Sequence, residues 1–116
     1  MQKRQRNYVR LCRRASALTH EELARLIGQR SDSAISQYES GQRLPTLRAA
    51  LALEVVFGKS PSFLFPGTYS AIEEEVMLRA AKVERALAEK NDRKSAAKRQ
   101  HLNDMSKRSR GNADGL

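Results

Sequence analysis

The spacing of helix-ending and helix-starting residues sets the strongest limit on how this chain can fold. Glycines at positions 28, 41 and 58 each follow a run of apolar residues with helical spacing, and each can take the left-handed conformation that closes a helix. A hydroxyl residue suited to cap the next helix follows each glycine within a few positions. These residues are Ser31, Thr46 and Ser60. The pattern predicts short helices joined by tight turns, and therefore an all-α fold.

The pattern divides residues 7–66 into five helical segments. The first begins at Asn7 and ends at Ala17 and Leu18. The second begins with a capping box, in which the Thr19 hydroxyl accepts from the amide of Glu22 and that carboxylate accepts from the amide of Thr19. Gly28 closes it. Two short helices around a glycine-containing turn are therefore expected here.

The third segment is capped by Ser31 and directs Ile35 and Tyr38 inward, because these residues lie three positions apart on one helix face. The fourth runs from Thr46 to Gly58, and the fifth is a short turn with Pro61 at its first position. We expect the compact domain to span residues 1–67 and to end at the helix breaker Pro66-Gly67.

The pattern of residues 68–90 predicts a further amphipathic helix. Ser70 and Glu73 form a second capping box, which is expected at its start. Its apolar stripe has two interpretations, a dimer interface or an extra layer packed on the compact domain. The stripe consists of Ile72, Val76, Ala80, Val83 and Leu87. Residues 91–116 contain little besides Leu102 and Met105 that could anchor structure, so a basic, largely disordered tail is expected.

The charge is concentrated at the two ends of the chain. The formal net charge is +9, residues 1–18 hold six basic and no acidic residues, and residues 91–116 hold seven basic and three acidic residues. Such a layout favours a polyanion such as nucleic acid as the partner. An acidic membrane surface, or no partner at all, is the alternative. Lys3, Arg4 and Arg6 are either an arm along DNA or a solvated tail.

The sequence offers no positive sign of catalysis, a cofactor or a metal site. Cys12 is the single cysteine and, with only His20 and His101 beside it, gives no ordinary four-ligand zinc set. Glu73, Glu74 and Glu75 are consecutive and point about 100° apart on a helix, which does not suit paired carboxylate catalysis. No apolar run reaches the roughly 20 residues of a membrane span, and no secretory signal is present, so a cytoplasmic location is expected.

The second and third segments together have the arrangement of a helix-turn-helix, in which the second helix enters the major groove of DNA. Over about residues 7–66 the sequence resembles the phage-repressor (Cro-like) helix-turn-helix family. The matching residues are Leu18, Leu23, Ala24, Gly28, Ile35, Ser36, Glu39, Gly41 and Pro45. The resemblance implies a five-helix DNA-binding domain.

Carried over residue by residue, the resemblance places groove-facing positions at Asp32, Ser33, Ser36 and Gln37. It places contacts with the DNA backbone at His20, Ser40 and Arg43. We add the turn residues Gln29, Arg30 and Ser31 to the candidate DNA-binding residues.

The residue spacing gives the same orientation independently. With Ile35 and Tyr38 directed inward, Ser33, Ser36 and Gln37 must project from another face. Gln37 is the best candidate for specificity, because its amide can form two hydrogen bonds with an adenine edge. Asp32 either accepts from a cytosine amino group or stabilises the helix N-terminus, and the second role is favoured.

These expectations describe a sequence-specific, double-stranded DNA-binding regulator. A dimeric transcriptional repressor of a bacterial or phage-like mobile element is favoured. The alternative is an antitoxin or interaction module whose residues 70–116 bind a partner protein, and a protein adaptor that has lost DNA binding is a third possibility.

Overall fold

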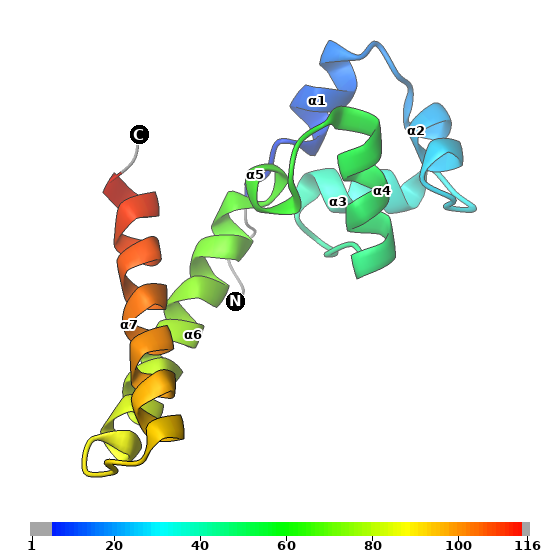
Figure 1. Ribbon diagram of the computed structural model, residues 1–116. Helices are drawn as coiled ribbons and strands as arrows, with labels where there is room; N and C mark the ends of the chain where they lie inside the picture. The colour runs from blue at the N-terminus through cyan, green and yellow to red at the C-terminus, as the bar shows by residue number, and fades with distance from the viewer. Residues whose placement is uncertain (1–5, 115–116) are drawn as a thin grey trace. The chain divides into compact units, whose positions relative to one another are not determined.

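The computed structural model describes residues 6–114, and this part of the chain contains seven α-helices and no strand (Figure 1). Side chains are described as far as Ser109. The helices are α1 (Val9–Ala15), α2 (His20–Leu26), α3 (Ser33–Ser40), α4 (Leu47–Phe57), α5 (Pro61–Leu64), α6 (Pro66–Leu87) and α7 (Arg93–Asp114). The predicted all-α class is confirmed, and the chain divides into two compact units, one up to Tyr69 and one from Ser70.

The first unit contains α1 to α5, which correspond to the five predicted segments. Its core is a single cluster to which every one of these helices or its end contributes. The buried members are Val9, Leu23, Ala24, Ile27, Ala34, Ile35, Tyr38, Leu53, Leu64 and Phe65. Ile35 and Tyr38 are fully buried, so the predicted inward face of the third segment is confirmed.

Helices α4 and α5 begin as their sequences predict, whereas α3 begins after Asp32 and not directly after the predicted cap Ser31. Thr46 and Ser60 each accept a hydrogen bond from a backbone amide in the first turn of the helix that follows. Gly41 ends α3 in the left-handed conformation with φ of 79°. Ala17 has a φ of 59°, which is unusual for a residue with a Cβ atom, and it lies in the turn between α1 and α2.

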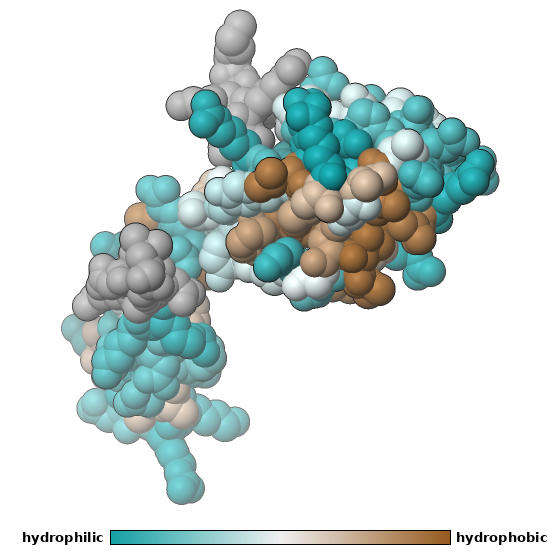
Figure 2. All heavy atoms as spheres, turned by 90° about the horizontal axis from the view of Figure 1, so that it is seen from above, coloured by the Kyte–Doolittle hydropathy of each residue, from teal (hydrophilic) through white to brown (hydrophobic). Residues whose placement is uncertain are grey.

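Helix α4 is apolar on both sides. One side contributes Ala49, Ala50 and Leu53 to the buried interior, while Leu51 and Val55 are exposed. Figure 2 shows brown, apolar side chains gathered on the surface of the first unit. Exposed leucine or valine is common on soluble proteins, but a continuous patch is a candidate for contact with another molecule.

The predicted helix breaker at Pro66-Gly67 is wrong, because α6 begins at Pro66. Proline is well tolerated at the first position of a helix, where its missing N–H would have no partner within the helix. The amide of Tyr69 donates to the carbonyl of Phe65 at 3.0 Å, so helical hydrogen bonding starts directly after α5. The proposed boundary at residue 67 therefore falls inside the first turn of α6, and the helix start predicted at Ser70 and Glu73 is wrong because both residues lie within the helix.

The expected disorder of residues 91–116 is also wrong for most of this segment, because residues 93–114 form α7. Asp92 begins the helix, accepting from the backbone amide of Ser95 at 3.2 Å and from its hydroxyl at 2.6 Å. Alanine, lysine, arginine and glutamine are strong helix formers, and they compensate for the scarcity of large apolar residues. Residues 115–116 lie outside the described part.

The second unit is a helical hairpin of α6 and α7 (Figure 1). Arg99 holds the end of α6, since its Nη1 donates to the carbonyls of Leu87 at 2.7 Å and Lys90 at 2.6 Å. The turn is thus stabilised by specific polar contacts at both helix ends. None of the described helices contains an apolar stretch long enough to cross a membrane.

Candidate nucleic-acid interface

Helices α2 and α3 form the candidate site, and α2 starts with the predicted capping box. The amide of Glu22 donates to the Thr19 hydroxyl at 3.0 Å, and the amide of Thr19 donates to the Glu22 carboxylate at 2.9 Å. The backbone hydrogen bond from Thr19 lowers the pKa of Glu22, and the Thr19 hydroxyl adds to this effect. The start of α2 is therefore fixed locally.

The turn between α2 and α3 ends on Ser31. The Ser31 hydroxyl accepts from the amide of Ser33 at 3.0 Å and lies 2.6 Å from the Ser33 hydroxyl. Asp32, the residue before the first helical position, makes no side-chain capping bond. Its exposed carboxylate lies beside the helix N-terminus, where a negative charge is favourable.

The outer face of α3 is polar and accessible. Ser33 and Ser36 are exposed, and Gln37 is half-buried. The Gln37 carbonyl accepts from the amides of Gln42 and Arg43 at 3.0 and 3.3 Å, whereas its side-chain amide has no hydrogen-bond partner among the described residues. The structure thus brings Asp32, Ser33, Ser36 and Gln37 together on or beside one short helix.

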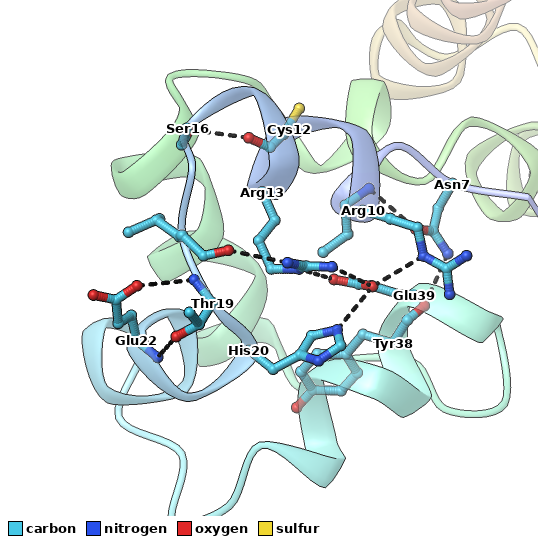
Figure 3. A network of polar contacts seen from close by, with 12 residues as sticks. Asn7, Arg10, Cys12, Arg13, Ser16, Thr19, His20, Glu22, Tyr38 and Glu39 are labelled. Carbon is cyan, nitrogen blue, oxygen red and sulfur yellow. Dashed lines mark hydrogen bonds and ion pairs between the residues drawn. The ribbon is translucent and has the colours of Figure 1, made fainter.

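The inner side of α3 carries a buried carboxylate. Glu39 has a side-chain exposure of 0%, and its oxygens meet cationic or imidazole groups from α1 and α2 (Figure 3). Arg13 Nε lies 2.6 Å from Oε2, Arg10 Nε lies 3.2 Å from Oε1, and His20 Nε2 lies 3.2 Å from Oε1. We call Arg10, Arg13, His20 and Glu39 the Glu39 cluster.

Burial opposes ionisation of Glu39, but the hydrogen bonds from Arg13, His20 and Arg10 outweigh it, so the pKa of this carboxyl is lowered. Arg13 is itself only 11% exposed, and it also donates from Nη1 to the carbonyl of Leu18 at 3.0 Å. One guanidinium therefore joins α1, the approach to α2 and the C-terminal end of α3.

The residues expected to contact the DNA backbone have mixed environments. His20 is half-buried and bound to Glu39, while Arg43 is exposed, with its guanidinium carbon 5.8 Å from the centre of the Tyr38 ring. The Ser40 hydroxyl donates to the carbonyl of Gln37 at 3.2 Å and accepts from the amide of Gln42 at 3.4 Å. Ser40 is thus occupied at the end of α3.

The remaining candidates lie in the turn or near the N-terminus. Arg30 is exposed and Gln29 half-buried in the segment before α3. Arg6 is exposed before α1, whereas Lys3 and Arg4 lie outside the described residues.

Comparison with known proteins relates this arrangement to one family. Residues 9–64 match a helix-turn-helix family model. These residues belong to the helix-turn-helix family. The resemblance to the phage-repressor type is confirmed, and the match supports a DNA-binding transcriptional regulator. Searches of curated proteins and of solved structures found no match to the chain.

The helix-turn-helix domain contains two functional candidates that the sequence reasoning missed. Arg10 and Arg13 are not among the residues that the sequence singles out for the site, yet both bind Glu39. A signal was present, because Glu39 lies four positions after Ile35 and thus on the inward side of α3. A carboxylate buried there requires cationic partners.

The Glu39 cluster also affects the charge of the surface. Arg10 is 56% exposed and His20 39% exposed, so parts of both side chains reach solvent above the buried carboxylate. Arg10 therefore adds a cation near His20, one of the residues that the sequence resemblance assigns to contacts with the DNA backbone.

Proposed function

We propose that this protein is a sequence-specific repressor that binds double-stranded DNA as a homodimer, with α3 in the major groove. The observation that carries the proposal is the polar outer face of α3, where the Gln37 amide has no hydrogen-bond partner among the described residues. A buried helix face opposite an accessible, uncommitted polar face is what base recognition requires.

The proposed roles divide the candidate residues into two groups. Gln37, Ser33 and Ser36 face the bases, and Gln37 forms two hydrogen bonds with an adenine, while Asp32 stabilises the helix N-terminus beside them. The other candidates contact phosphates and position the domain without reading sequence. They are His20, Arg43, Ser40, Gln29, Arg30 and Ser31, and the exposed part of Arg10 joins them.

Two domains on adjacent half-sites would give the contact area that one short recognition helix lacks. Repression follows from occlusion, because a dimer covering a promoter excludes the polymerase. The resemblance to phage repressors favours a bacterial or phage-like mobile element as the source of the regulated promoter, and the cytoplasm as the place of action. The net charge of +9 favours binding to a polyanion.

Selection of bound sites from random duplexes, followed by measurements on Gln37→Ala, tests the proposal. We expect this variant to lose about 1 to 3 kcal/mol of binding free energy on the selected site and almost none on random DNA. Gln42→Ala makes the same change at an exposed position just beyond α3, and it should not alter the ratio between the two affinities. Equal losses on both DNAs for Gln37→Ala would remove this residue from base reading.

The regulatory direction needs a separate measurement. Transcription from a promoter containing the selected site should fall when the protein is added before the polymerase. An increase in transcript would contradict repression but leave DNA recognition intact.

A further inference from the structure

The second unit leaves most of its apolar stripe uncovered. Among its described side chains only Ala80, Leu87 and Ser95 are buried. Ile72, Val76 and Val83 of α6 are 52%, 40% and 50% exposed. A pair of helices with so small an interior has too little buried apolar area to be stable alone, and small units of this kind commonly associate.

The two helices form an apolar groove with a basic edge. Val83 of α6 and Ala97 and Leu102 of α7 line a cavity of about 370 Å³, and Lys98 and His101 border it. Both bordering residues are exposed, and neither forms an ion pair with a described residue. The groove therefore suits an apolar helix that carries a negative charge on its flank.

The exposed part of α6 has this character. Ile72, Val76 and Val83 are spaced by four and seven residues, which places them along one side of the helix. Glu75 stands directly beside Val76, is exposed, and has no ion-pair partner among the described residues. The stripe and the groove of the same unit are thus both apolar, and Glu75 beside the stripe is opposite in charge to Lys98 at the edge of the groove.

We propose that the α6 stripe of one copy lies in the α6/α7 groove of a second copy, with Glu75 facing Lys98 and His101 of that copy. This inference rests on the homodimer of the proposed function and names its interface. A two-fold axis repeats each contact, so that the dimer is a four-helix bundle with two copies of the charge pairing.

The contact requires the two α6 helices to be antiparallel. Ile72 of one copy then meets Val83 of the other, and the two-fold axis passes near the midpoint of positions 72 and 83. In this arrangement Ala97 and Leu102 of each copy gain the apolar neighbours that the single hairpin does not provide. Glu75 of each α6 helix and the basic edge of each groove are brought together at the same time.

The first test measures the molecular mass of the full-length protein by sedimentation equilibrium. We expect wild type to be dimeric and Val83→Asp to be monomeric at the same concentration. Val55→Asp is the matched control, because it makes the same change at a valine that is 85% exposed on α4. It should remain dimeric, and circular dichroism should show that all three proteins keep their helix content.

The second test exchanges the charges. Glu75→Lys and Lys98→Glu should each raise the dimer dissociation constant about tenfold at low salt, since each puts like charges together twice per dimer. The combined variant should return to within about threefold of wild type. Glu21→Lys reverses an exposed charge on α2 and should leave the dissociation constant unchanged.

A monomeric wild type would overturn the inference. Loss of the dimer in Val55→Asp but not in Val83→Asp would also overturn it, and so would a combined charge-exchange variant that does not regain the wild-type dissociation constant.

DNA binding is measured separately with the selected duplex. If the Val83→Asp monomer still prefers that duplex, base recognition is retained without the dimer. If wild type forms the predicted dimer and selects no site, the interface stands and the DNA-binding proposal fails.

Discussion

Neutralising Glu39 tests whether the buried cluster stabilises the helix-turn-helix domain. Glu39→Gln keeps the size of the side chain but removes its charge and replaces one accepting oxygen with a donating amide. The carboxylate has 0% side-chain exposure and accepts from Arg13 at 2.6 Å, so no water can take over its role without local opening. The change leaves the guanidinium of Arg13 with a poorer partner.

The expected magnitude depends on which partners are buried. Removing one member of a buried pair costs about 3–5 kcal/mol. Arg10 and His20 are 56% and 39% exposed and can turn to solvent, whereas Arg13 is 11% exposed and cannot. Only the Arg13 interaction should therefore count fully, and we expect a loss near the lower end of that range, about 3 kcal/mol of unfolding free energy.

Urea unfolding followed by circular dichroism measures this loss, and Glu21→Gln is the matched control. Glu21 pairs with Arg25 at 3.0 Å, but the two side chains are 72% and 77% exposed, so the same substitution should cost less than about 0.5 kcal/mol. Equal effects of the two substitutions would refute the claim that burial makes the Glu39 contacts stabilising.

The double variant Arg13→Met, Glu39→Met removes both buried charges and should be more stable than Glu39→Gln.

The effect should also depend on pH. Because the pKa of Glu39 is lower in the folded state than its ordinary value of 4.5, the ionised form stabilises the fold. This contribution is complete above pH 4.5 and is lost as the pH falls through the folded-state pKa. The difference between wild type and Glu39→Gln should therefore be constant from pH 7 to about 5 and shrink at lower pH. A constant difference down to pH 2 would contradict this assignment.

Two further substitutions test features of the backbone and core. Ala17→Gly should raise the unfolding free energy by about 0.5–1 kcal/mol, because glycine adopts the observed φ of 59° without strain; thermal unfolding checks this, and a loss would contradict it. Tyr38→Phe should be neutral or stabilising by about 1 kcal/mol, since the buried Tyr38 hydroxyl has no partner among the described residues; a loss above 1 kcal/mol in urea unfolding would show that the hydroxyl is bonded.

The helices of the first unit were predictable because their signals are local. A capping box such as Thr19 and Glu22, or a glycine such as Gly41, specifies a helix end within a few residues of itself. The inward positions of Ile35 and Tyr38 follow from helical spacing alone. The polar outer face of α3 is predictable as well, because residues of a helix that do not lie on its inward side must project from another side.

The two predictions that are wrong, at Pro66-Gly67 and over residues 91–116, also have physical causes. Pro66-Gly67 has the composition of a turn, but proline at a first helical position and a hydrogen bond from Tyr69 to Phe65 allow α6 to begin there. Residues 91–116 contain few apolar residues, which predicts disorder, whereas their helix-forming residues and the Asp92 cap produce α7. At both places a local helix start prevails, with a proline at the first helical position in α6 and an aspartate cap before α7.

The Glu39 cluster could not be identified from spacing because it is tertiary. Arg13 and Glu39 are separated by 26 positions, and only the folded arrangement of α1, α2 and α3 brings them together. Spacing shows that Glu39 points inward, but not which of the many basic residues meets it. His20 lies at the start of α2 and also contacts the Glu39 carboxylate of α3. This second contact likewise depends on the folded arrangement of the helices.

The contacts around α3 hold the backbone of its C-terminal half in place, which supports the role that we propose for Gln37. Arg13 holds Glu39, and the Asn7 amide donates to the carbonyl of Tyr38 at 2.9 Å, so two residues of this half are tied to the N-terminal part of the domain. Gln37 immediately precedes them. A contact that requires two hydrogen bonds with one base depends on a firmly held backbone. At the other end, the one described residue that the Ser31 hydroxyl binds is its near neighbour Ser33, and that end lies next to the connecting turn. This difference supports the proposed division of roles, in which residues of the turn contact phosphates and Gln37 reads a base.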